Sequence, residues 1–362
     1  MRAAGPVLDS LQGLALGDAF GDRWFSVPAD EAPAALAARL TRPAPWHWTD
    51  DTAMALVLVR HLAAHGEVRQ DALAGEFAAE YAREYDRKYG PSMHRVLRGI
   101  GAGGDWRAIT AGQFEGQGSY GNGAAMRVAP LGAWFADDLV AAARQAELQA
   151  RTTHFHPEAV VGAVAVALAA ALAVRSRGET PPGRAELLTE IAGRLPDSDV
   201  RSGLRIAARL PEHTSVRHAA NVLGSGAMIS APDTVPFALW SAAGNPDSLP
   251  ETVWHTLEGW GDQDTTCAIA AGVVAARTGL ADVPAAWLHA REDLPAWVTG
   301  DADEPFAPAG PDAQDRPDAQ DGQDGPDAPG GAGLSGGTGL SGGAGEHGRP
   351  SGQRRTMRSS TP

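Results

Sequence analysis

Residues 156–176 read HPEAVVGAVAVALAAALAVRS, and this stretch decides the fold class of the chain. A proline suits the first turn of a helix, and the sixteen residues after Glu158 are all apolar. The run is shorter than the ~20 residues that a membrane span needs. Because alanines and valines cover every face, we expect a helix that packs closely against other helices in the middle of a bundle.

Two further segments, 50–65 and 263–280, are also apolar on nearly every face. Strong helix formers fill three more segments, 69–86, 138–151 and 183–194, and Pro, Gly and Asn separate them. Alternating β-branched strands are not evident. The sequence therefore predicts an all-α, single-domain orthogonal helical bundle over residues 1–298. The Pro-, Asp- and Gly-rich repeats of residues 299–362 predict a disordered tail.

Composition narrows the class of function. The chain has 362 residues and a formal net charge of -14, with no block of basic residues, so nucleic acid is not indicated as a partner. The single cysteine, Cys267, cannot form an intrachain disulfide, and its apolar neighbours predict a small core residue. Polar residues interrupt any apolar signal core near the N-terminus. We therefore expect a cytoplasmic protein with no membrane contact.

Two acidic strings open two of the apolar segments, TDDT at 49–52 and GDQDTT at 261–266. Aspartate at a helix start caps free backbone N–H groups, and this is the simpler interpretation of the first string alone. The second string has a glycine turn with carboxylates two residues apart, which suits a hard cation. If the strings meet, four carboxylates crowd together and a cation neutralises them. Oxygen ligands without a Cys or His cluster favour Mg²⁺ or Mn²⁺ over Zn²⁺.

Two other stretches carry chemistry. Residues 116–127 read GQGSYGNGAAMR, and these glycines let backbone N–H groups approach an anion closely, although a plain surface loop is the alternative. No Gly-Lys-Ser/Thr follows, which excludes a Walker loop. Residues 152–158 read TTHFHPE, where a hydrogen-bonded histidine at a helix start is the favoured role. The other histidines show no useful spacing and are expected to be structural or exposed.

These stretches, in this order and together with GLALGDAFG at 13–21, resemble the ADP-ribosylglycohydrolase family, the relatives of dinitrogenase reductase-activating glycohydrolase. The resemblance covers about residues 5–295. It implies an all-α bundle with a dinuclear centre, two Mg²⁺ or Mn²⁺ ions, at the bottom of a cleft. It also implies hydrolysis of the bond between ADP-ribose and a modified acceptor, which is an ADP-ribosylated protein or a small ADP-ribosyl compound.

The resemblance assigns roles to residues. The implied metal ligands are Thr49, Asp50, Asp51, Asp262, Asp264 and Thr265. Asp50 and Asp51 are in addition the catalytic pair, which holds the metal and positions the attacking water. The implied substrate contacts are Tyr89, Gly90 and Ser92, in a loop that borders the diphosphate, with Ser119, Tyr120, Gly121, Asn122, Gly123 and His154.

The chain departs from the family pattern at two positions. Phe25 stands where many members carry a glutamate on a mobile loop that reaches the metal, and Gln263 stands where many have threonine. Asp22, Asp30 or Glu31 are candidate replacements for that glutamate. A catalytically lapsed ADP-ribose-binding protein is therefore the alternative function. A phosphatase of the haloacid dehalogenase type is a third, because residues 262–266 fit its Asp-x-Asp-x-Thr pattern.

Overall fold

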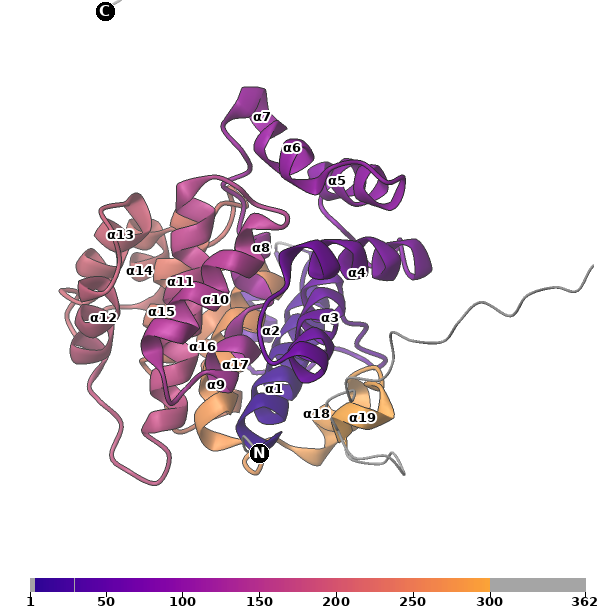
Figure 1. Ribbon diagram of the computed structural model, residues 1–362. Coiled ribbons are helices and arrows are strands. Elements are labelled where there is room, and N and C mark those ends of the chain that lie inside the picture. The colour runs from indigo at the N-terminus through magenta and orange to yellow at the C-terminus, as the bar shows by residue number, and fades with distance from the viewer. Residues whose placement is uncertain (1–3, 29, 300–362) are drawn as a thin grey trace, which may run out of the picture. The chain divides into compact units, whose positions relative to one another are not determined.

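A computed structural model describes residues 4–28 and 30–299 of the chain. Within these ranges the chain forms nineteen helices and no strand (Figure 1), which confirms the all-α prediction. The predicted tail, residues 299–362, lies outside the described ranges apart from Thr299. Its disorder, and the domain boundary after residue 298, stay predictions.

The helices begin and end as follows. In chain order they are α1 (Ala4–Asp22), α2 (Ala32–Ala37), α3 (Asp50–His65), α4 (Gln70–Arg83), α5 (Pro91–Gly101), α6 (Trp106–Ala111), α7 (Gln113–Gly116), α8 (Gly123–Met126), α9 (Ala129–Trp134), α10 (Leu139–Arg151), α11 (Pro157–Arg175), α12 (Arg184–Gly193), α13 (Asp199–Ala207), α14 (Val216–Leu223), α15 (Ala231–Ala242), α16 (Leu249–Leu257), α17 (Gln263–Thr278), α18 (Ala285–Ala290) and α19 (Ala296–Thr299).

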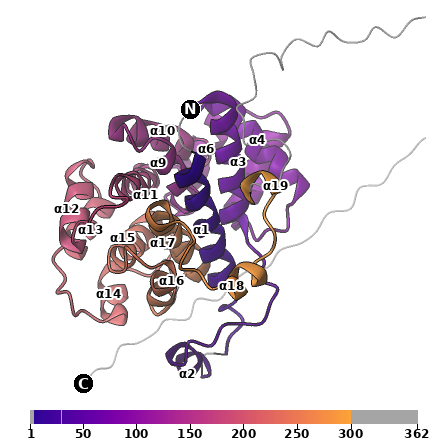
Figure 2. The ribbon, with the colours of Figure 1, turned by 90° about the horizontal axis from the view of Figure 1, so that it is seen from below.

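The three helices predicted to be central are buried on nearly all faces. In α17, thirteen of sixteen residues are buried, and in α3 twelve of sixteen. Figure 2 shows α17 between α1 and α15, and α11 packs against α9, α10, α15 and α17. Among the described helices, α11 is the one long and apolar enough to cross a membrane, but 67% of its most apolar window is buried inside the fold. Such burial is typical of a core helix.

Helices α1 and α17 lie unusually close together because glycines on α1 face the α17 backbone. A Cβ atom added at Gly17 would lie 2.3 Å from the carbonyl oxygen of Cys267, and one at Gly21 would lie 2.2 Å from that of Gln263. Both distances are shorter than real Cβ contacts. Only glycine therefore allows the two backbones to touch, and the contact places Asp18 near the start of α17. Cys267 itself is fully buried, as predicted.

Candidate metal centre and substrate cleft

The acidic strings begin α3 and α17, but the side chains at the two N-cap positions do not cap these helices. Thr49 and Asp262 occupy the N-cap positions, and neither side chain accepts a hydrogen bond from a backbone N–H of the first turn. The predicted side-chain cap of the first string is therefore absent at Thr49, whereas Asp50 and Asp51 lie in the first turn of α3, as that interpretation also expects. The phosphatase alternative is also wrong, because the second string begins a helix in a described region that contains no strand.

Three helices bring three carboxylates together at one point. One oxygen each of Asp18 on α1, Asp51 on α3 and Asp264 on α17 lies within 4.8 Å of the other two. Asp51 Oδ1 is buried and has no hydrogen-bond partner among the described residues. A buried carboxylate oxygen without a partner carries a large desolvation cost. The centre is therefore electrostatically incomplete, and oxygen-rich sites of this kind fit a hard divalent cation.

Asp18 is the residue of this centre that the sequence analysis did not assign. It is fully buried, and its two oxygens accept four hydrogen bonds. The backbone N–H and the hydroxyl of Thr49 donate at 2.9 Å each, and the backbone N–H and hydroxyl of Thr52 donate at 3.2 and 2.5 Å. These bonds occupy about all the lone pairs of a carboxylate. Asp18 therefore ties α1 to the start of α3 and orients Thr49 and Asp51.

Burial and mutual repulsion raise the pKa values of these acids. Burial raises the pKa of Asp18 to about 6, against the lowering effect of its bonds from Thr52 and Thr49. Burial is also the first cause for Asp50, Asp51 and Asp264, whose pKa values lie well above the usual range. The charge of Asp18 is the next cause for Asp50 and Asp51, and that of Asp262 for Asp264. Like charges this close cannot all ionise unless a cation neutralises them.

Four carboxylates, those of Asp50, Asp51, Asp262 and Asp264, line a cleft of about 370 Å³, whereas that of Asp18 does not. The predicted residues that line it are Asp50, Asp51, Gly90, Ser92, Ser119, Tyr120, Gly121, Asn122, Gly123, His154, Asp262, Asp264 and Thr265. Two predicted residues, Thr49 and Tyr89, do not line the cleft and are 1% and 4% exposed. Thr49 donates to Asp18, and the Tyr89 hydroxyl is buried without a hydrogen-bond partner in the described residues.

Hydrogen bonds connect His154, which lines the cleft, to Thr153 and through it to Arg127. The buried guanidinium of Arg127 donates to Thr153 Oγ1 at 2.8 Å, so the Thr153 hydroxyl proton is free to point at His154 Nδ1, also at 2.8 Å. When the hydroxyl donates in this way, Nδ1 accepts and the ring proton is on Nε2. Burial, and secondly Arg127, lowers the pKa of His154 to about 3, so the ring is neutral at physiological pH. His154 therefore presents a neutral ring to the cleft.

The glycine-rich stretch supports its neighbours in the cleft. A Cβ at Gly123 would lie 2.7 Å from His154 Cε1, so glycine makes room for the ring. Asn122 Nδ2 donates to Asp262 Oδ2 at 2.7 Å and to Thr234 Oγ1 at 3.0 Å. The amide N–H groups of Asn122 are thus used within the protein, where they hold one of the predicted metal ligands.

Strained backbone gathers at the rim of the cleft. Lys88, Phe114 and Ile229 have φ values of 61°, 49° and 52°, and all three line the cleft. Positive φ is unusual for residues other than glycine and strained for a β-branched one. Such strain is often found where a ligand binds. Phe114, Met228 and Ile229 are also more than half exposed, so the rim offers apolar surface beside the polar floor.

The stretch that lacks the family glutamate has one acid near the centre. Phe25 is 51% exposed and does not line the cleft. Asp30 and Glu31 are exposed, whereas Asp22 is 7% exposed and forms an ion pair with Lys88. The charge of Asp22 contributes to the raised pKa of Asp18. Among the three candidates, Asp22 is therefore the one that lies near the carboxylates.

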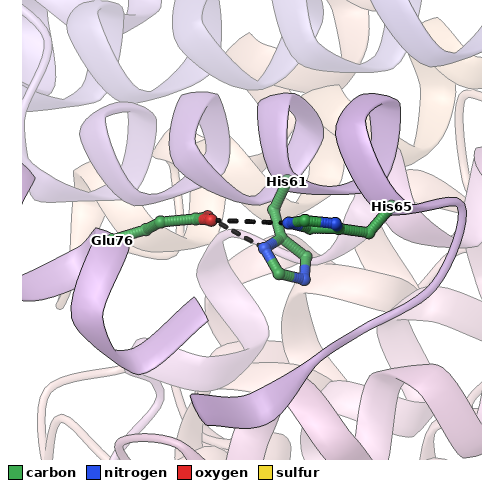
Figure 3. A group of neighbouring side chains, drawn as sticks. All are labelled: His61, His65 and Glu76. Carbon is green, nitrogen blue, oxygen red and sulfur yellow. Dashed lines mark hydrogen bonds and ion pairs between the residues drawn. The ribbon is translucent and has the colours of Figure 1, made fainter. Parts of the chain in front are cut away.

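A second group of possible metal ligands, His61, His65 and Glu76, lies between α3 and α4 (Figure 3). The backbone N–H of Arg69 donates to His61 Nε2 at 3.0 Å, so the ring proton is on Nδ1 and donates to Glu76 Oε2 at 2.9 Å. A metal on Nδ1 would have to displace that proton while Nε2 still accepts a hydrogen bond. His61 is therefore a structural histidine, as the sequence analysis expected.

Comparisons with known proteins agree with this geometry. The family model described as ADP-ribosylglycohydrolase matches residues 3–315. Human ADP-ribosylhydrolase ARH3 is 30% identical over 273 residues, which is 68% of this chain and 75% of that protein. An uncharacterized protein of Archaeoglobus fulgidus is 31% identical over 248 residues, 68% of this chain and 76% of its own.

Among solved structures, an ADP-ribosylglycohydrolase-related protein complex aligns with a TM-score of 0.58 at 27% identity, over 80% of this chain and 92% of that one. The family model spans most of the chain, and it covers every acid of the centre and the whole lining of the cleft. The chain belongs to the ADP-ribosylglycohydrolase family.

Proposed function

We propose that this chain is a metal-dependent hydrolase that cleaves the N- or O-glycosidic bond between ADP-ribose and a modified acceptor. The observation that carries the proposal is the convergence of α1, α3 and α17, which brings Asp18, Asp51 and Asp264 together beside a cleft that Asp51 and Asp264 line. Membership of the family supports hydrolysis of ADP-ribose linkages. The cleft volume of about 370 Å³ lies within the range of small-molecule sites, about 300–1,000 Å³.

The donor set fits two Mg²⁺ or Mn²⁺ ions. All candidate ligands are oxygens, and Asp51 Oδ1 lacks any other partner in the described residues. The residues that would hold the ions are Thr49, Asp50, Asp51, Asp262, Asp264 and Thr265. The Thr49 hydroxyl donates its proton to Asp18, which leaves its lone pairs free to face a cation. Asp18 itself would act as the carboxylate that orients these ligands.

The chemistry follows from charge placement. When bound, a metal pair lowers the pKa of a coordinated water and orients ribose hydroxyls at the anomeric carbon. Asp50 and Asp51 would position that water by accepting its hydrogen bonds. His154 would contact a substrate oxygen with a neutral ring, which donates from Nε2 when Thr153 donates to Nδ1. The apolar rim would exclude bulk water from the bond that breaks.

The test is release of ADP-ribose from peptides modified on serine or on arginine. We expect release with Mg²⁺ or Mn²⁺, no release with excess EDTA, and recovery when Mg²⁺ is restored. Asp51→Asn should lose the activity, whereas Asp137→Asn, which changes an exposed acid outside the cleft, should keep it. Whichever peptide is cleaved identifies the acceptor class.

The alternative, a lapsed ADP-ribose-binding protein, is motivated by Phe25, which stands in the place of the family glutamate. It predicts tight binding of ADP-ribose with no release from either peptide under any metal. That result would overturn the hydrolase proposal and leave the binding function.

A further inference from the structure

We propose that Lys88 binds the diphosphate of ADP-ribose, and that it leaves its ion pair with Asp22 to do so. The proposal deepens the proposed function and rests on it, because it takes ADP-ribose as the ligand. One side chain of this protein then recognises the negative charge of the substrate.

The charge of the cleft singles out Lys88. Among the described residues that line it, Lys88 is the one cation, against the four carboxylates of Asp50, Asp51, Asp262 and Asp264. The cleft histidine adds no charge, because its ring is neutral. A diphosphate carries about two negative charges and needs a cation on the side that faces away from the metal floor. Lys88 is also the single lysine in the sequence.

The position of Lys88 also suits an anion. Lys88 lines the cleft together with Gly90, Pro91 and Ser92, where the eleven-residue helix α5 begins. Backbone N–H groups at a helix start suit an anion where they lack partners. Pro91 has no N–H and the Met93 N–H donates to the Gly90 carbonyl oxygen, so Ser92 carries the N–H of this first turn that can bind an anion. Lys88 and Ser92 line the same cleft, so the Lys88 ammonium and the Ser92 N–H can act on one phosphate group together.

The lysine side chain is free to move. The Lys88 side chain is 61% exposed, whereas its partner Asp22 is 7% exposed. The flexible stem can swing the ammonium from Asp22 to a bound anion without taking it out of water. In the absence of substrate the ion pair holds Lys88 at the rim. An ion pair with only a structural role would instead tie the loop before α5 to the end of α1, whatever the cleft contains.

Two substitutions that break the same ion pair distinguish these roles. The affinity for ADP-ribose is measured by calorimetry in Mg²⁺ for Lys88→Met and Asp22→Asn, with adenosine as the ligand that lacks phosphate. We expect Lys88→Met to weaken ADP-ribose binding about tenfold, the effect of one charge-assisted hydrogen bond, and to leave adenosine unchanged. Asp22→Asn should strengthen ADP-ribose binding, because it releases Lys88. Equal weakening in both variants would overturn the proposal.

A second measurement uses the unmodified protein and does not depend on how the variants fold. An amine-selective acetylating reagent can modify only Lys88 and the α-amino group, since the sequence has no other lysine. We expect saturating ADP-ribose to slow acetylation of Lys88 and to leave the α-amino group, the internal reference, unaffected. Binding of ADP-ribose without protection of Lys88 overturns this proposal alone. No binding of ADP-ribose overturns the proposed function together with it.

Discussion

The close contact between α1 and α17 leads to a quantitative prediction for Gly17→Ala. The added Cβ would lie 2.3 Å from the carbonyl oxygen of Cys267 and 2.8 Å from the Ala271 side chain, whereas ordinary contacts begin at 3.4 Å. The first distance has to grow by 1.1 Å, the difference between 3.4 and 2.3 Å. Because the atom in the way belongs to the backbone, the helices themselves have to separate.

Two opposing contributions to the free energy of unfolding set the size of the stability change. Alanine in place of glycine favours a helix by about 0.5–1 kcal/mol, and overpacking in a core costs about 1–3 kcal/mol. We therefore expect Gly17→Ala to lower the free energy of unfolding by about 1–2 kcal/mol. Asp18 follows Gly17 and holds the start of α3, so the same movement separates Asp51 from Asp264. Metal–ligand distances tolerate changes of only about 0.2 Å, so the affinity for Mn²⁺ should fall at least ~10-fold.

The assay combines urea unfolding in EDTA with Mn²⁺ titration by calorimetry. Gly75→Ala is the matched control, because Gly75 lies inside α4, is exposed, and a Cβ added there would meet nothing within 4 Å. It should gain about 0.5–1 kcal/mol of stability and keep its Mn²⁺ affinity. The reasoning is refuted if Gly17→Ala gains stability as the control does and binds Mn²⁺ like the unchanged protein.

Three further predictions concern the site. In EDTA, the pKa of Asp18 is about 6 in the folded protein, against the usual value of 3.8, so the folded state binds this proton more tightly than the unfolded state does. The stability that the bound proton contributes is therefore lost as pH rises from about 4 to about 6. Urea unfolding should show the stability of the unchanged protein relative to Asp18→Asn falling by about 3 kcal/mol across that range, and a flat difference would contradict it. Gly123→Ala should displace the His154 ring and weaken ADP-ribose binding measured by calorimetry. The control variant Gly75→Ala should bind ADP-ribose as the unchanged protein does. Saturating Mn²⁺ should raise the melting temperature, and the rise should shrink in Asn122→Ala, which removes the amide that holds Asp262; an equal rise in both proteins argues against that support.

The central helices could be predicted from the sequence because their apolar runs extend over every face. Predicted segments 50–65, 156–176 and 263–280 agree with α3, α11 and α17 to within two residues at each end. Helix α4 ends at Arg83, three residues before the predicted end at 86. Shorter helices such as α13 and α14 were not predicted, because a few turns between loops give little periodic signal.

Site residues could be predicted where a short sequence pattern indicates them, and not where their role depends on contacts between segments far apart in the sequence. Asp51 and Asp264 stand at helix starts beside hydroxyl residues, and that local pattern indicates ligands. Asp18 lies inside a helix, and its role depends on bonds to a segment 31 residues later. A lone acid in the apolar, glycine-spaced stretch 13–21 was the signal that could have indicated it. The bonds from Arg127 through Thr153 to His154 likewise required the folded arrangement.

The most direct test of the metal centre is anomalous diffraction from a crystal of this protein soaked in Mn²⁺. We expect anomalous peaks at the floor of the cleft, within ligand distance of Asp51 and Asp264. Peaks confined to the group of His61, His65 and Glu76, or no peak at the cleft floor with saturating Mn²⁺, would contradict the proposed metal centre.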